Sequence, residues 1–319
     1  MEKKRIDYVD LVKGISIFLV VWVHTSHPGW LTFILVNSIF FMLAGFFFKR
    51  KPIKLFLKEK VKYLLLPFTF FYLLSYPFRL LLHFWDHRCF DGFNWNCIWD
   101  VFTISERTDY LSVNVPLWFI LCLFVIQLLY YGISFLPRKI ILLIGVAAIL
   151  LKEILNGIPS MFMVNAAFYY IGFFILGNLS GKPVIEAFHH LKHKLLIAFS
   201  ALATICLISL SGTFLDASPV APVTEAVSLF SVLLLLLFVC SWGNDRKALR
   251  LPKFYGVNTL AVLGYHVPVL IFIKRISNAI FHTSTPLLGF IHCIITLFLL
   301  FFIIKWSNRY IPLLVGKKK

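Results

Sequence analysis

The sequence predicts an all-α, polytopic integral membrane protein with about ten transmembrane helices and both termini in the cytosol. Three observations lead to this fold class. Hydrophobic residues make up 60% of the 319 positions, whereas soluble domains average roughly 45–50%. The mean hydropathy is +0.87, and apolar runs near the ~20 residues that a spanning helix needs follow one another along the chain. Lys and Arg gather in the short segments between these runs, as topology signals do.

Ten apolar runs predict the individual spans. They cover 8–27, 30–48, 62–84, 113–135, 138–155, 160–179, 194–212, 221–241, 254–273 and 286–306. Pro and Gly mark the ends of these runs, and we find no internal repeat, low-complexity tract or separate soluble part. We therefore expect residues 1–319 to form a single transmembrane domain.

The distribution of positive charge sets the expected orientation. If the spans alternate, 25 of the 31 Lys and Arg residues fall on the same side as both termini, and 6 fall on the other side. Cytosolic segments of membrane proteins carry this excess, so both termini are expected in the cytosol. Topology and attraction to the lipid bilayer account for the net charge of +17, and nucleic acid is not expected as a partner.

The first span, "RIDYVDLVKGISIFLVVWVH", carries ionisable residues along one face. Lys13 and His24 are eleven residues apart, about 20° past three helical turns. Asp10 lies three residues before Lys13, close enough to pair with it. Ionisable residues inside a span are costly and indicate function. The plainer alternative is that Lys13 and His24 merely reach the inner and outer interfaces.

His266 is the predicted counterpart of His24. It lies ten residues past Gly256 in "GVNTLAVLGYHVP", about 15 Å along a helix that runs outward. Two His residues at similar depth are expected to share a polar cavity, although a single buried His is more often only a hydrogen-bonded core residue. His24, His27 and His266 also leave open a metal site, which the absence of nearby acids disfavours.

Weaker signals lie at the ends of other spans. Lys58, Lys60 and Lys62 precede the third span and suit a phosphate or serve only as a topology signal. Asn114 and Trp118 in "NVPLWF" and Arg79 near the outer end of the third span are candidates for contact with an acceptor.

The outer loop 85–112 is rich in aromatic rings, amides and carboxylates. This mixture suits a hydroxylated ligand such as a sugar, and it equally suits an interfacial aromatic belt. Cys89 and Cys97 lie in the same loop and would form a disulfide if it faces an oxidising compartment.

These motifs, in this order, resemble acyltransferase family 3, the bacterial multi-span enzymes that acylate surface sugars. The resemblance rests on "RIDYVDLVKGISIFLVVWVH", "IFFMLAGFFFKR", "KVKYLLLP", "PLWFI" and "GVNTLAVLGYHVP" and covers most of the chain. Lys13 and Ala44 stand where this family commonly has Arg and Ser.

The resemblance implies transfer of an acyl group, expected to be acetyl, from cytosolic acyl-CoA to a sugar hydroxyl of a surface polysaccharide or lipid-linked glycan. His24 and His266 are then the catalytic candidates. Asp10, Lys13, Lys58, Lys60 and Lys62 are the candidates for binding acyl-CoA, a donor substrate rather than a bound cofactor. Asn114, Trp118 and Arg79 are the acceptor-binding candidates. The implied location is the bacterial inner membrane.

A transporter or flippase of lipid-linked glycan is the alternative, because it would also carry ionisable residues on helix faces. Such proteins often show paired interrupted helices in two halves, and the sequence has no such symmetry. Consumption of the thioester separates the two functions.

Overall fold

The computed structural model describes residues 6–26, 30–102, 111–151, 154, 161–211, 221–242, 247–281 and 285–317. Every regular element in these ranges is helical. The α-helices are α1 (Asp7–Ser26), α2 (Trp30–Phe46), α3 (Ile53–Lys60), α4 (Leu66–His87), α5 (Trp118–Ile133), α6 (Arg138–Leu150), α8 (Val164–Ala187), α9 (Leu191–Ser211), α10 (Ala221–Trp242), α11 (Arg250–Val257), α12 (Thr259–Phe281) and α13 (Pro286–Tyr310). A π-helical turn, η1 (Val61–Leu65), and short 3₁₀ segments, η2 (Trp95–Phe102), η3 (Val115–Leu117), η4 (Met161–Met163) and η5 (Lys247–Leu249), connect them.

Seven segments within the described ranges are long and apolar enough to cross a membrane. They are Asp7–Thr25, Ile53–His87, Val115–Ile133, Leu191–Ser209, Ala221–Trp242, Thr259–Phe281 and Pro286–Tyr310. The all-helical, multi-span class is therefore confirmed. The remaining predicted spans are helical as well, but α6 has 13 residues and α2 has 17, fewer than the ~20 of a typical span. The count of ten stays a prediction.

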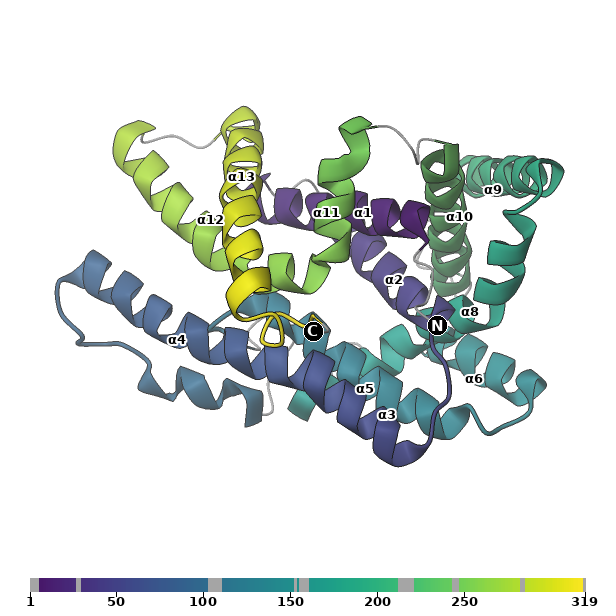
Figure 1. Cartoon of the computed structure of the whole chain (residues 1–319), viewed down its shortest axis with the longest axis horizontal. Coiled ribbons are helices and arrows are strands. Elements are labelled where there is room, and N and C mark those ends of the chain that lie inside the picture. The colour runs from purple at the N-terminus through teal and green to yellow at the C-terminus, as the bar shows by residue number, and fades with distance from the viewer. Residues whose placement is uncertain are drawn as a thin grey trace.

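The third predicted span, 62–84, is shorter than the helix that forms. α3, η1 and α4 make one helical rod of 35 residues, which runs along one edge of the molecule in Figure 1. Pro67 does not break it, because it occupies the first turn of α4 directly after the π-helical turn. The amphipathic α3 thus extends the predicted span by two turns at its basic end.

The ninth predicted span, 254–273, is wrong as one continuous helix. The chain turns at Asn258, between α11 and α12. Asn258 competes with the helix backbone: its Nδ2 donates to the carbonyl oxygen of Phe254 at 2.7 Å, and its Oδ1 accepts from Nδ2 of Asn308 on α13 at 2.9 Å. A side chain that bonds to nearby backbone in this way favours a helix end. α12, which carries His266, starts only after this turn.

α1 crosses the middle of the molecule, and α10, α11 and α13 run across it (Figure 1). Glycines allow the closest crossing. A Cβ on Gly256 of α11 would overlap the carbonyl oxygen of Asp10, and one on Gly14 of α1 would overlap that of Pro252. The helix that carries Asp10, Lys13 and His24 is therefore fixed against α11 by direct backbone contact.

Two ion pairs join helix ends that alternating spans would place on the same side of the membrane. Lys253 of α11 pairs with Asp7 of α1 at 3.3 Å, joining two ends that were expected on the cytosolic side. Arg275 of α12 pairs with Asp86 of α4, joining two ends that were expected outside. The compartment that each side faces, and with it the cytosolic location of the termini, stays a prediction.

Candidate active site

The structure brings His24 and His266 together. His24 lies in the last turn of α1 and His266 near the middle of α12, and their ring centroids are 5.2 Å apart with an interplanar angle of 51°. The two rings are thus neighbours, whereas the shared polar cavity and the catalytic role stay predictions. The contact joins two helices that are more than two hundred residues apart in the chain.

His266 is held in one tautomer by its own helix. Its ring is fully buried, and Nδ1 lies 2.9 Å from the carbonyl oxygen of Val262 and 3.1 Å from that of Leu263. Carbonyl oxygens only accept hydrogen bonds, so Nδ1 carries the hydrogen and Nε2 carries the lone pair. Nε2 has no partner among the described residues. The arrangement therefore presents a buried basic nitrogen beside His24.

Lys274 ties His24 to the helix that carries His266. Its Nζ donates to the backbone carbonyl oxygen of His24 at 2.9 Å. Lys274 follows His266 by eight residues on α12, so this contact fixes the end of α1 against the same helix. Lys274 is one of the six Lys and Arg residues expected on the outer side, although a cation inside an apolar run is by itself an indication of function.

His292 of α13 is a third imidazole near this site, buried like that of His266, and it was missed in the sequence. Only 6% of the residue is exposed, and its Nε2 has no partner among the described residues. It lies within electrostatic range of Lys274. Two residues earlier, Phe290 packs edge-on against Trp22 of α1 at 5.9 Å, which aligns the start of α13 with the His24 end of α1.

Asp10 and Lys13 lie at the opposite end of the α1 face. Lys13 Nζ is 3.5 Å from Asp10 Oδ1, so the predicted pairing is confirmed. The same Nζ lies 5.7 Å from the centroid of the Phe47 ring, within the range of a cation–π contact. Phe47 follows the end of α2, so Lys13 stands between two helices rather than free at a surface.

Two cavities meet at Lys13 and Phe47. The larger, about 720 Å³, is lined by Asp10, Lys13 and residues at the ends of α2 and α8, among them Lys49 and Lys182. The smaller, about 280 Å³, shares Lys13 and Phe47 and extends between α2, α5 and α12 as far as Leu263. Leu263 precedes His266 by three residues, almost one helical turn. The two cavities thus mark a path from a basic mouth toward the His pair.

The comparisons with known proteins decide the family. The sequence model of the acyltransferase domain, Acyl_transf_3, matches residues 6–306, nearly the whole chain. The protein belongs to the acyltransferase 3 family. No curated protein and no solved structure matched the chain. With its apolar helices, this membership identifies a multi-pass membrane protein and supports an acyltransferase activity.

Three of the basic residues predicted for the donor site lie elsewhere in this acyltransferase. Lys58, Lys60 and Lys62 line neither of the two cavities that meet at Lys13. Lys60 lies over the ring of Phe56 at 5.2 Å and Lys62 over that of Tyr63 at 5.7 Å. Lys49 and Lys182 line the larger cavity instead, because α8 ends beside α2. No short sequence motif reveals this packing.

Asn114 is the predicted acceptor residue that the fold brings nearest to the His pair. It is almost fully buried, and its Nδ2 donates to Ser75 Oγ at 2.9 Å and to the carbonyl oxygen of Gly264 at 3.0 Å. Because that carbonyl can only accept, the amide orientation is fixed and Oδ1 is the remaining atom. Oδ1 has no partner among the described residues. It lies beside the turn of α12 that precedes His266.

The other two acceptor candidates lie on α5 and α4. Trp118, expected just inside the outer interface, is buried against Phe41 and Tyr170 at 6.5 and 5.6 Å between ring centroids. It packs inward because α5 runs through the core beside α2 and α8. Arg79 is exposed on α4, near Cys97 of η2.

Cys89 and Cys97 are free thiols in this structure. Burial, together with the nearby carboxylate of Asp100, raises the pKa of the Cys97 thiol, against a smaller opposing effect of Arg79. Among the described residues no three His, Cys, Asp or Glu side chains gather into a metal site. The option of a metal on His27 lies outside the described residues.

Proposed function

We propose that the protein transfers an acyl group, specifically acetyl, from cytosolic acyl-CoA to a sugar hydroxyl of a surface polysaccharide or lipid-linked glycan in the bacterial inner membrane. The observation that carries the proposal is the unpartnered, buried Nε2 of His266 beside His24, at the end of a path that begins at Lys13. The proposal builds on the acyltransferase family.

The basic cavity suits the donor. The head group of coenzyme A is anionic, and Lys13, Lys49 and Lys182 outnumber the carboxylates of Asp10 and Glu186 in the lining of the cavity at the wide end of the path. Coulomb attraction from these cations holds the head group there. The uncharged pantetheine arm then passes Phe47 into the narrow cavity, whose lining is largely apolar, and the thioester lies near Leu263, one turn from His266.

The His pair suits the transfer step. An imidazole takes the proton of the sugar hydroxyl as its oxygen attacks the thioester carbonyl carbon. The carbon–sulfur bond breaks, and the CoA thiolate leaves and takes up the proton, so the products are the sugar ester and free CoA. His24 is the base in this scheme, because it is only partly buried, whereas a charge on the fully buried His266 is costly. His266 Nε2 accepts a hydrogen bond from the protonated His24 and stabilises it.

Release of CoA by the purified full chain tests the proposal. The protein in lipid nanodiscs is incubated with acetyl-CoA and a glycan acceptor, and free CoA and acylated glycan are measured by mass spectrometry. We expect both products from the wild type and from His190→Ala, a change at an exposed turn between α8 and α9. His24→Ala and His266→Ala should yield neither.

If the wild type binds glycan and moves it across the bilayer without releasing CoA, the transferase proposal fails in favour of the flippase alternative.

A further inference from the structure

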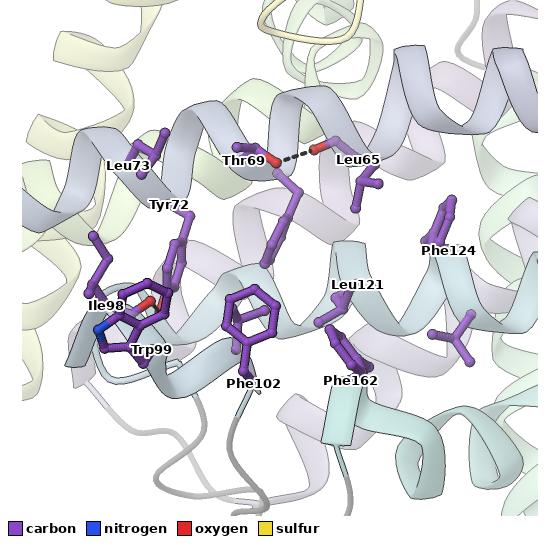
Figure 2. A pocket seen from close by; sticks show the side chains of 13 residues that line it. Leu65, Thr69, Tyr72, Leu73, Ile98, Trp99, Phe102, Leu121, Phe124 and Phe162 are labelled. Atoms are coloured by element: carbon purple, nitrogen blue, oxygen red, sulfur yellow. Dashed lines mark hydrogen bonds between the residues drawn. The ribbon is translucent and has the colours of Figure 1, made fainter. Parts of the chain in front are cut away.

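A third cavity lies beside α4. It has a volume of about 710 Å³, and its walls come from α4, η2, α5 and η4 (Figure 2). Leu73, Trp99, Phe102 and Phe162 are partly exposed at its rim. In a membrane protein such a volume is open to hydrocarbon.

The lining offers no polar group to a ligand except the Trp99 indole at the exposed rim. Thr69 Oγ1 donates to the carbonyl oxygen of Leu65 at 3.0 Å. The Tyr72 hydroxyl lies 2.9 Å and 3.1 Å from the carbonyl oxygens of Cys97 and Ile98. Because these hydroxyls are satisfied within the protein, the cavity can recognise only an apolar chain.

The hydroxyl of Tyr72 also makes η2 a fixed wall of the cavity. η2 belongs to the loop between α4 and α5, whose composition suits a sugar or an interfacial aromatic belt. Along α4, Tyr76 adds a second contact, from its hydroxyl to the carbonyl oxygen of Trp95 at 3.2 Å. The loop between α4 and α5 thus contributes a wall of the cavity.

α4 forms one wall of this cavity and also contacts the turn of α12 before His266. The stripe of α4 next to Tyr72 carries Phe71 and Ser75. The Phe71 ring packs directly on Gly264 and lies 4.9 Å from the Tyr265 ring. Ser75 bonds to Asn114, whose Oδ1 is buried and unpartnered among the described residues. The amide oxygen of Asn114, an acceptor without a donor among the described residues, therefore lies next to the helix that forms one wall of the cavity.

A positively charged residue lies on α4 beyond the residues that line the cavity. Arg79 comes seven residues after Tyr72, two turns along nearly the same face of the helix. It is exposed and within electrostatic range of Cys97 in η2. An apolar volume that ends near a cation complements a lipid with an anionic head group.

We propose that this cavity holds the hydrocarbon chain of a phosphate-linked lipid that carries the acceptor sugar, with the phosphate near Arg79. The inference rests on the proposed function, since the sugar of this lipid is the group to be acylated. The chain anchors the lipid on one face of α4, and a sugar hydroxyl that reaches the other face donates to Asn114 Oδ1.

Binding of a long-chain polyprenyl phosphate by the purified, delipidated full chain tests the site. Leu73 and Leu74 are neighbours on α4 and are both exposed, but only Leu73 lines the cavity. Leu73→Trp fills the cavity from its exposed rim, so we expect it to weaken binding about tenfold or more. The matched control Leu74→Trp should bind like the wild type. Native mass spectrometry measures the bound fraction.

The charge is tested with a second pair of variants. Arg79→Gln should weaken binding of the polyprenyl phosphate but not of the uncharged polyprenol, and Arg88→Gln, an exposed residue just after α4, should change neither. Unchanged binding in Leu73→Trp overturns the site. Equal displacement by phosphatidylglycerol overturns it too, because the cavity then holds an ordinary bilayer lipid.

The same preparations separate this inference from the proposed function. If the wild type releases CoA with a polyprenyl-linked sugar and Leu73→Trp does so equally well, the lipid site is overturned and the transferase stands. If the wild type binds the polyprenyl phosphate selectively but releases no CoA, the proposed function and the acceptor role of this lipid both fall.

Discussion

At the scale of single residues, the chemistry depends on which nitrogen of His266 is free. The helix carbonyls of Val262 and Leu263 hold Nδ1, so Nε2 faces the interior with its lone pair. A hydroxyl or imidazolium donor is then the partner that this atom requires. The His24 ring lies 5.2 Å from the His266 ring, between centroids.

We predict that His24→Ala and His266→Ala each lower kcat about 10²- to 10⁴-fold, the usual contribution of acid–base catalysis. The double variant should be hardly worse than either single one, because residues that act as a unit are non-additive. Steady-state release of CoA measures this. Fully multiplicative losses would instead show that the two His residues act independently.

Lys274→Met should lower kcat about 10²-fold with little change in the KM for acyl-CoA, because the backbone of His24 loses its tie to α12 and a small misplacement of a catalytic group is costly. Lys274→Arg should restore much of the rate. The neighbour Arg275, which pairs with Asp86 instead, gives the control: Arg275→Gln should keep the kcat. An equal loss in both variants would mean that the effect comes from lost positive charge or stability in this region and not from the tie to His24.

At the scale of elements, the sequence predicted helices well and their breaks poorly. Apolar runs locate nearly every helix, because a chain that crosses the bilayer must satisfy its backbone hydrogen bonds internally, as a helix does. The turn at Asn258 depends on Asn308 of α13, a tertiary contact that periodicity does not contain. The Lys cluster at 58–62 does not line the cavity at Lys13 for the same reason, since α8 rather than α3 supplies the second wall of that cavity. Its role in binding the donor stays a prediction.

The candidate site was partly predictable on the same grounds. Lys13 and His24 share one helix, so their common face follows from helical geometry alone. Lys274 and His292 come from α12 and α13, and only the packed fold shows that they lie near His24.

Gly256→Ala should destabilise the protein by about 1–3 kcal/mol or more, because the added Cβ forces α11 away from Asp10 and overpacking has that cost. Gly132 of α5 is the matched control: a Cβ there meets no atom within 4 Å. Gly132→Ala should leave the thermal midpoint in detergent unchanged or raise it. A Gly256→Ala midpoint equal to that of the wild type would show that the α1–α11 contact is loose.

At the scale of the whole molecule, the proposed acyl transfer requires one continuous route from the Lys13 cavity to the His pair. Lys13→Ala should raise the apparent Kd for acyl-CoA about fivefold, since one cation near an anionic group is worth about 1 kcal/mol. Lys13→Arg should keep the affinity. Titration with a non-hydrolysable acyl-CoA analogue measures it, and an unchanged Kd in the Ala variant would remove Lys13 from the donor site.

The most direct test of the route uses sealed vesicles of known orientation. Labelled acetyl-CoA is added outside inside-out vesicles that hold the glycan acceptor in their lumen. The account predicts labelled glycan in the lumen with the wild type and none with His24→Ala, and it predicts no labelling when the acetyl-CoA is added to right-side-out vesicles. Equal labelling from both orientations, or labelling at the wild-type rate in His24→Ala, would contradict transfer across the membrane at the His pair.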